Sequence, residues 1–346
     1  MARSITVASL FAGGGGWEIG AQLLGWQPLW ASELDPQIAA CHDAALPATQ
    51  VFVGDVRLLD PSLLAKVDVL CVSPPCQGHS IALHHKAKAR KDERDDLLVG
   101  LEALRIAKAL RPKAIVAENV REYQDSAAFP QLVAGLQALG YVVDARNVVC
   151  ANYGVASTRQ RLILRAVLRG PQDLAFPARE LPQPTWDAAL ADLLPHLPPG
   201  AALAPWQART LLSAPPPPGV DLLINGYSTT TAAKVLGEVR RAALSRADLP
   251  QRAWWPPGRP GPTMVASKAA MLGFRILRKD GSVARFTARC AARLQSFPDS
   301  YPLPDEGLAF KIIGNAVPPQ LAARVLASLA PVLDGCSYLD STQHLR

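Results

Sequence analysis

The chain lacks the features that would place it in a membrane or outside the cell. Hydrophobic residues make up 49% of its 346 residues, yet they form no uninterrupted apolar stretch of the roughly 20 residues that a membrane-spanning helix needs. The beginning, Met1-Ala2-Arg3-Ser4, carries no signal-peptide pattern. We therefore expect a globular, cytoplasmic protein without a membrane partner.

The six cysteines form no metal-binding pattern. They are Cys41, Cys71, Cys76, Cys150, Cys290 and Cys336, and they include no C-x-x-C pair and no histidine pair at zinc-ligand spacing. We expect no metal site and, for five of the six, buried and reduced thiols among aliphatic neighbours. Cys76 differs, because two prolines precede it and a glycine soon follows.

Length and charge narrow the class of protein further. A chain of 346 residues is long enough for one large domain and a smaller one. The formal charge of +7 and the pI near 9.2 are compatible with a polyanionic partner such as nucleic acid, but they are not specific for one.

Short apolar runs alternate with helical patterns over residues 5–168. Strands are predicted at about 5–12, 29–32, 51–53, 67–72, 114–117, 141–149 and 161–167, with helices from about 17, up to about 44, and at about 95–110 and 130–139. This β-α-β rhythm predicts an α/β fold with a Rossmann-like, doubly wound and mostly parallel sheet.

The amino-acid composition changes between Gly170 and about Val265, a stretch that contains 17 of the chain's 31 prolines. Four tryptophans in this stretch favour a folded, loop-rich insert over a solvated linker. Helical patterns return at about 286–295 and after Pro318-Pro319, to about 333.

We expect a catalytic and cofactor-binding domain at 1–169, a second domain at 170–270, and a C-terminal segment at 271–346. Part of that segment would support the insert, and residues 308–335 would pack back on the first domain.

A glycine-rich turn, Phe11 to Gly16, follows the first predicted strand and opens a helix. Glycines allow the backbone to approach a ligand closely, although such a turn can also be purely structural. The next strand ends in Glu33, where a carboxylate can bind ribose hydroxyls. Together these residues predict a site for a nucleotide-like cofactor.

A thiol and a carboxylate follow two further predicted strands, in Ser73-Pro74-Pro75-Cys76-Gln77 and Glu118-Asn119-Val120. Ligands of open α/β sheets bind beyond the carboxyl ends of the strands, so both groups would face one pocket. Residues 77–94 are rich in lysine, arginine and histidine. Such a run is usually a solvated face, but beside a nucleophile it could form a mobile lid.

The two motifs, at this spacing and in this order, resemble those of the DNA cytosine-5 methyltransferases. The resemblance covers about residues 5 to 333 except the insert, and it implies the class I methyltransferase fold. It also implies S-adenosyl-L-methionine as cofactor and double-stranded DNA as substrate. Cys76 would add to C6 of a flipped cytosine, and Glu118 would assist at N3 while the methyl group passes to C5.

Further motifs assign roles by the same resemblance. Phe11 would stack on the adenine of the cofactor, Glu33 would bind its ribose, and Asp55 would bind the adenine amino group, although Asp55 could equally cap a turn. The full cofactor set comprises Phe11, Ala12, Gly13, Gly15, Gly16, Glu33, Leu34, Asp55, Val56, Pro74, Asn315 and Val317. Substrate-binding positions are Gln77, Ser80, Lys86, Lys88, Arg90 and Asn119. We also expect Asn119 to fix the strand end or the Pro-Cys loop by side-chain hydrogen bonds.

The stretch Ser157-Thr158-Arg159-Gln160-Arg161 resembles the family motif Gln-x-Arg-x-Arg, with serine in place of glutamine. Arg159 and Arg161 join Cys76 and Glu118 in the predicted catalytic set, and the family places the second arginine at the flipped base. A phosphate contact or a salt bridge is the alternative.

The resemblance makes the insert a target-recognition domain that reads base edges, with Arg240, Arg241, Arg246 and Arg252 available for DNA contacts. It leaves open a cognate restriction endonuclease as partner, and we expect a monomer.

Several other functions remain open. A tRNA cytosine-5 methyltransferase would carry a shorter insert with a Cys-Phe-Thr signature, which is absent here. A silent DNA-binding regulator of the same fold would be expected to lose Cys76 or Glu118. A nicotinamide-dependent oxidoreductase would not explain the Pro-Pro-Cys-Gln motif, and methyltransferases of exocyclic amines use Pro-Pro-aromatic motifs instead.

Overall fold

The computed structural model describes residues 4–75, 93–169, 175–179, 181–213, 215–225, 254–266 and 268–335. Several residues named above lie outside these ranges, namely Cys76, Gln77, Ser80, Lys86, Lys88, Arg90, Arg240, Arg241, Arg246, Arg252 and Cys336.

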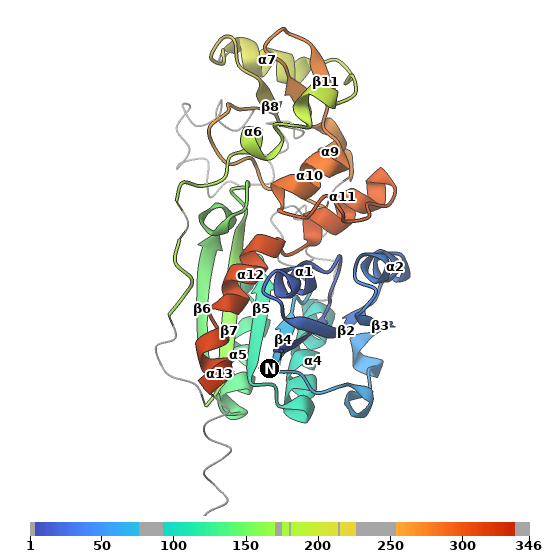
Figure 1. Cartoon of the computed structure of the whole chain (residues 1–346), viewed down its shortest axis with the longest axis vertical. Coiled ribbons are helices and arrows are strands. Elements are labelled where there is room, and N and C mark those ends of the chain that lie inside the picture. The colour runs from blue at the N-terminus through green and yellow to red at the C-terminus, as the bar shows by residue number, and fades with distance from the viewer. Residues whose placement is uncertain are drawn as a thin grey trace, which may run out of the picture.

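A seven-stranded sheet forms the lower part of the molecule (Figure 1). Its strands are β1 (Thr6–Leu10), β2 (Gln27–Glu33), β3 (Gln50–Val53), β4 (Val69–Val72), β5 (Ala114–Asn119), β6 (Tyr141–Val149) and β7 (Gln160–Leu168). Their order is β3-β2-β1-β4-β5-β7-β6, and β7 runs antiparallel to both of its neighbours, β5 and β6. The predicted α/β fold with a mostly parallel sheet is confirmed.

Helices cover both faces of this sheet. They are α1 (Gly16–Gln22), α2 (Pro36–Ala45), α4 (Glu93–Leu110), α5 (Ala128–Ala138), α12 (Pro319–Ala327) and α13 (Ala330–Gly335). Alternate residues of a strand point to opposite faces, so Val7 packs with α1 and α12 whereas Ala8 packs with α4 and α5. Apolar burial on both sides explains the nearly continuous hydrophobic strands of the sequence.

A second sheet of four short antiparallel strands lies above the first (Figure 1). It is formed by β8 (Leu222–Ile224), β9 (Trp254–Trp255), β10 (Arg275–Leu277) and β11 (Val283–Arg285), in the order β11-β10-β8-β9. The sheet thus combines two strands of the predicted insert with two from the segment after residue 270. We call it, with α6 (Trp186–Ala189), α7 (Pro205–Ser213) and α9 (Lys268–Gly273), the smaller domain.

One hydrophobic cluster joins the smaller domain to the rest of the chain. It includes Trp186 and Phe274 of the smaller domain, Leu294 of α10 (Ala288–Leu294) and Phe310 of α11 (Glu306–Asn315). Ile19 of α1 belongs to the same cluster. The C-terminal segment therefore packs on both domains at once.

The helices of the C-terminal segment differ from the sequence prediction in two ways. Helix α11 was not predicted, and the single last helix to about residue 333 is wrong, because α12 ends at Ala327 and α13 begins at Ala330. Pro331 has no N–H to continue the helical hydrogen bonds, and the Ser328 hydroxyl donates to the carbonyl of Val325.

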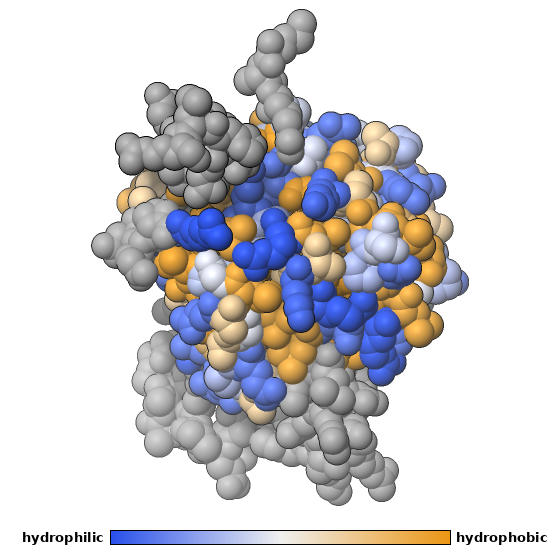
Figure 2. Space-filling model, turned by 90° about the horizontal axis from the view of Figure 1, so that it is seen from below, coloured by the Kyte–Doolittle hydropathy of each residue, from blue (hydrophilic) through white to orange (hydrophobic). Residues whose placement is uncertain are grey.

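The lower end of the molecule has the mixed character of ordinary protein surface. Seen from below, its coloured residues intersperse hydrophilic and hydrophobic side chains (Figure 2). Within the ranges given above, no helix is long and apolar enough to cross a membrane. The carboxyl ends of the parallel strands lie at the opposite edge, toward the smaller domain (Figure 1).

Candidate active site

The glycine-rich turn follows β1 at this upper edge. Phe11, Gly13 and Gly15 adopt left-handed backbone conformations, with φ of 59°, 56° and 82°. The Gly13 N–H donates to Glu33 Oε2 at 2.8 Å, and the Asp35 N–H donates to Glu33 Oε1 at 2.9 Å. Glu33, at the end of β2, therefore holds the turn and the start of α2 in place.

The turn packs closely against the C-terminal segment. A Cβ on Gly16 would lie 2.0 Å from the carbonyl oxygen of Val317, and one on Gly14 would lie 2.4 Å from Ile312 Cγ2. Real Cβ atoms do not come this close to other atoms, so only glycine fits at either position. The packing brings Val317, which is buried, to the predicted cofactor residues, while Asn315, the last residue of α11, is exposed.

Two further predicted cofactor residues follow β2 and β3. Leu34 is 68% exposed, an unusual position for a large apolar side chain beside a carboxylate. Asp55 caps the short 3-10 helix Val56–Leu58 by accepting from the Arg57 N–H at 2.9 Å. Its hydrogen bonds from the Arg57 side chain lower the pKa of the Asp55 carboxyl. The turn-capping alternative for Asp55 is thus present, and a role toward the cofactor stays a prediction.

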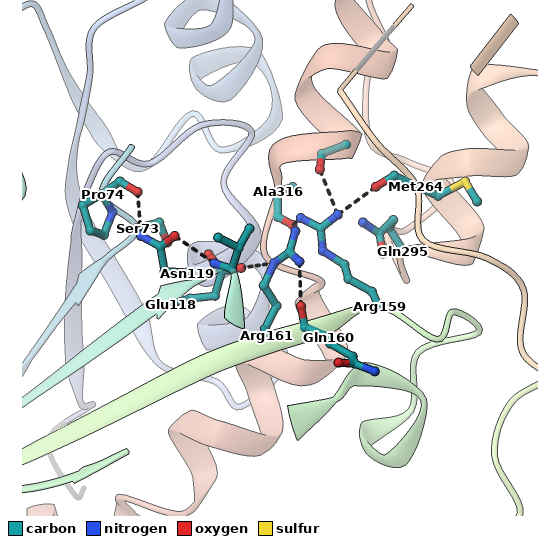
Figure 3. A network of polar contacts seen from close by, with 12 residues as sticks. Ser73, Pro74, Glu118, Asn119, Arg159, Gln160, Arg161, Met264, Gln295 and Ala316 are labelled. Atoms are coloured by element: carbon teal, nitrogen blue, oxygen red, sulfur yellow. Dashed lines mark hydrogen bonds and ion pairs between the residues drawn. The ribbon is translucent and has the colours of Figure 1, made fainter. Parts of the chain in front are cut away.

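The loop that leads from β4 to Cys76 is fixed from two sides. Trp17 Nε1 donates to Ser73 Oγ at 3.0 Å. Asn119 Nδ2 donates to the Pro74 carbonyl at 3.1 Å (Figure 3). Asn119 Oδ1 accepts from the Val120 N–H at 2.8 Å. The hydrogen bonds expected of Asn119 are therefore formed, whereas the contact of Trp17 was missed because no local pattern connects it with Ser73.

Glu118 and Arg161 form a buried ion pair at the end of β5. Arg161 Nε lies 2.5 Å from Glu118 Oε1, and the two side chains are only 11% and 6% exposed. They come from neighbouring antiparallel strands and point toward one another (Figure 3). Loss of either partner would leave an uncompensated charge in the interior.

Arg159, two residues before Arg161 in sequence, makes a different set of contacts. Its guanidinium donates to the carbonyls of Met264 and Gly314, both at 2.8 Å, and to that of Ala316 at 3.2 Å (Figure 3). Only 1% of Arg159 is exposed. Ser157, where the family has glutamine, donates to the Pro262 carbonyl at 2.7 Å.

The cysteines that the structure describes have the burial expected of unreactive thiols. Cys71, Cys150 and Cys290 are buried, and Cys41 is partly buried. Burial raises the pKa of Cys150 to about 11, and it raises the pKa of Cys71 and Cys290 as well. Within the described ranges, no group of three or more His, Cys, Asp or Glu side chains is placed to hold a metal ion.

A comparison with models of protein families identifies the family to which the chain belongs. The model of the C-5 cytosine-specific DNA methylase family matches residues 5–214 and 225–330. The chain belongs to this family. It is a DNA cytosine-5 methyltransferase, a class of enzyme that needs a methyl donor and a DNA substrate.

Curated and solved relatives agree with this membership. The type II methyltransferase M.AplI of Arthrospira platensis is 30% identical over 344 residues, which cover 95% of this chain and 87% of the relative. M.NgoPII of Neisseria gonorrhoeae, also named a type II methyltransferase, is 27% identical over 350 residues, 95% of this chain and 96% of its own. The methyltransferase shares its fold with a prophage-encoded E. coli protein described as a DNA modification methyltransferase. That structure has a TM-score of 0.66 and 23% identity, and the match covers 96% of this chain and 100% of the other.

Proposed function

We propose that this methyltransferase acts on one short sequence of double-stranded DNA and transfers a methyl group from S-adenosyl-L-methionine to C5 of a flipped cytosine. The observation that carries the proposal is the buried Glu118–Arg161 pair at the end of β5. It lies beside Asn119, which holds the loop leading to Cys76. In the sequence, Cys76 follows shortly after β4, the neighbour of β5, and a carboxylate together with a thiol suits addition to a pyrimidine ring.

The residues at the upper edge of the sheet fit S-adenosyl-L-methionine. Glu33 ends β2 and Asp55 follows β3, at places where carboxylates that bind ribose and adenine would lie. Leu34 offers an exposed apolar side chain for the adenine ring, and the glycine turn permits close approach to the methionine part. When bound there, the cofactor supplies an electrophilic methyl group on a sulfonium.

Each protein group then has a defined task. The Cys76 thiolate forms a bond to C6 of the flipped cytosine, and Glu118 hydrogen-bonds N3 so that the ring can accept the electron pair. Arg161 holds one oxygen of the Glu118 carboxylate and thereby fixes its orientation. After methylation, a base removes the proton from C5 and the thiolate leaves C6, which restores the aromatic ring and frees Cys76.

We infer that the smaller domain reads the DNA sequence. Its strands and loops lie above the carboxyl edge of the large sheet, so a duplex bound between the two would present a base to Glu118 (Figure 1). Base edges are distinguished in the major groove.

The names of M.AplI and M.NgoPII as type II methyltransferases support a place in a restriction–modification system with a cognate endonuclease. We infer that the enzyme acts in the cytoplasm as a monomer.

Base-resolution mapping of 5-methylcytosine tests this function. Methylation-deficient cells would express the wild-type chain, Cys76→Ala, or the control Cys41→Ala, whose partly buried thiol lies on α2. We expect marks at one short sequence with wild type and Cys41→Ala, and none with Cys76→Ala. Unmarked DNA in cells that contain folded wild-type protein would contradict the proposal.

A further inference from the structure

Three segments that are far apart in the sequence meet at Arg159. The guanidinium donates to the carbonyl of Met264 in the segment after β9, and to the carbonyls of Gly314 and Ala316 where α11 joins α12 (Figure 3). We call these contacts the Arg159 joint. A planar guanidinium donates in fixed directions, so it sets the relative positions of the carbonyls it binds.

The segments of the joint are also packed against one another. A Cβ on Gly314 would lie 2.2 Å from the Ala266 backbone nitrogen and 2.2 Å from the Val265 carbonyl carbon. Next to Arg159, the Thr158 N–H donates to the Gly261 carbonyl at 2.8 Å. Residues 261–266 therefore cannot shift without moving residues 314–316.

Each segment leads to a different part of the proposed enzyme. Residues 314–316 contain Asn315 and directly precede Val317, whose carbonyl lies against Gly16 of the glycine turn. Residues 261–266 connect β9 with α9 of the smaller domain. Strand β7 follows Arg159 directly and carries Arg161, the partner of Glu118.

We propose that Arg159 is a positioning residue that couples cofactor binding to the placement of the smaller domain, instead of contacting the flipped base. Occupation of the cofactor site fixes residues 314–317, and the joint passes this constraint to residues 261–266. By linkage, DNA held by the smaller domain then tightens cofactor binding by the same factor. The inference rests on the proposed function, because it needs both ligands.

Calorimetry with S-adenosylhomocysteine tests the coupling. Its Kd would be measured without DNA and with a duplex that carries the sequence found by methylcytosine mapping. For the wild type we expect the duplex to tighten binding about tenfold, within the usual range of allosteric coupling. In Arg159→Lys, the ratio of the Kd without DNA to the Kd with DNA should fall toward one, because an ammonium cannot span three carbonyls as a guanidinium does.

Arg165→Lys is the matched control. Arg165 is equally buried and lies on β7, the strand that follows Arg159, but its guanidinium donates to the Ala175 carbonyl and Ser328 Oγ, both at 2.9 Å, and pairs with Asp144. This variant should lose stability yet keep the wild-type ratio. An unchanged ratio in Arg159→Lys, or an equal loss in both variants, would overturn the proposal.

Hydrogen exchange of the wild type tests the coupling between the cofactor site and residues 261–266, even if Arg159→Lys does not fold. Added S-adenosylhomocysteine should slow amide exchange in peptides covering 312–317 and also in those covering 261–266. Protection of the first segment alone would refute the coupling while leaving the proposed function intact. A wild-type protein that binds no S-adenosylhomocysteine at all would instead refute the proposed cofactor, and the coupling with it.

Discussion

At the scale of single residues, the account depends on the buried pair of Glu118 and Arg161. Glu118→Gln keeps the size and a hydrogen-bond acceptor but removes the charge, so the group can no longer act as an acid or base at N3. We expect methyl transfer to slow by about 10² to 10⁴-fold, the usual range for general acid–base catalysis.

The control for this substitution is Glu122→Gln, a partly buried carboxylate in the segment Arg121–Asp125 that follows β5. Single-turnover assays on unmethylated phage DNA would compare the variants, with S-adenosylhomocysteine affinity as the test of an intact cofactor site. A Glu118→Gln enzyme with the wild-type rate constant would remove Glu118 from the mechanism.

Trp17 offers a second prediction at this scale, because its indole N–H holds Ser73 in the loop before Cys76. Trp17→Phe keeps a buried aromatic ring but deletes the donor and part of the indole volume. We expect a loss of stability of about 1 kcal/mol for the hydrogen bond and a further loss for the smaller ring. Since the loop is freed, the chemical step should slow with little change in cofactor affinity.

Trp30→Phe controls for the loss of the bond itself. Trp30 is as buried as Trp17, and its Nε1 donates to the Ala65 carbonyl at 2.8 Å. It should show the same loss in urea unfolding but the wild-type rate of methyl transfer. Equal slowing in both variants would show that the contact of Trp17 with Ser73 has no specific role.

At the scale of elements, the sequence predicted the strands of the large sheet well and the C-terminal helices less well. Strands such as β4 and β5 are buried on both faces, so their composition alone identifies them. The end of α12 is set by Pro331 and by Ser328, which also accepts from Arg165 across the fold. Such tertiary contacts have no local signature, and the same holds for the bonds of Arg159 to residues 264, 314 and 316.

The contact between α2 and α11 predicts a dependence of stability on pH. Lys311 Nζ lies 2.7 Å from Asp35 Oδ2, and its hydrogen bond lowers the pKa of the Asp35 carboxyl. A depressed carboxyl pKa stabilises the fold above the unfolded value of about 3.9, and this stabilisation is lost as the pH falls through the folded value.

Lys311→Met should therefore lower the free energy of unfolding at pH 7 by about 0.5 kcal/mol, since the pair is partly exposed. Urea titrations between pH 3 and pH 7 would measure the difference from wild type, which should shrink below about pH 4. A difference that is constant over this range would assign the effect to packing of the lysine side chain.

At the scale of the whole molecule, the C-terminal segment makes one folding unit of the two sheets. The cluster that contains Phe274 and Phe310 reaches Ile19 of α1, so the apolar residues that the structure describes in the smaller domain share one core with the C-terminal segment and α1. We expect thermal unfolding to be a single transition, with circular dichroism and tryptophan fluorescence coincident. Phe310→Ala, which leaves a cavity in this cluster, should lower the midpoint for both probes together. Two separate midpoints would show that the domains unfold independently.

The strand ends that carry the predicted site residues could be located from the order of the motifs, but the close contacts between distant segments could not. The glycine turn, Glu33, Glu118 and Asn119 occupy strand ends that the sequence itself marks. The sequence predicted that residues 308–335 pack back on the first domain, but the close approach of Val317 to Gly16, about 300 residues away in the chain, is seen only in the folded molecule.

Covalent trapping tests the central claim most directly. A duplex prepared with 5-fluorocytosine cannot lose the group at C5, so an enzyme that adds a thiolate to C6 and methylates C5 stays attached to its DNA. Incubated with S-adenosyl-L-methionine and resolved on a denaturing gel, the wild-type chain should form a protein–DNA band of added mass. Cys76→Ala should form none, and Glu118→Gln should form it slowly. A wild-type chain that methylates ordinary DNA yet leaves the fluorinated duplex free would contradict covalent catalysis by Cys76.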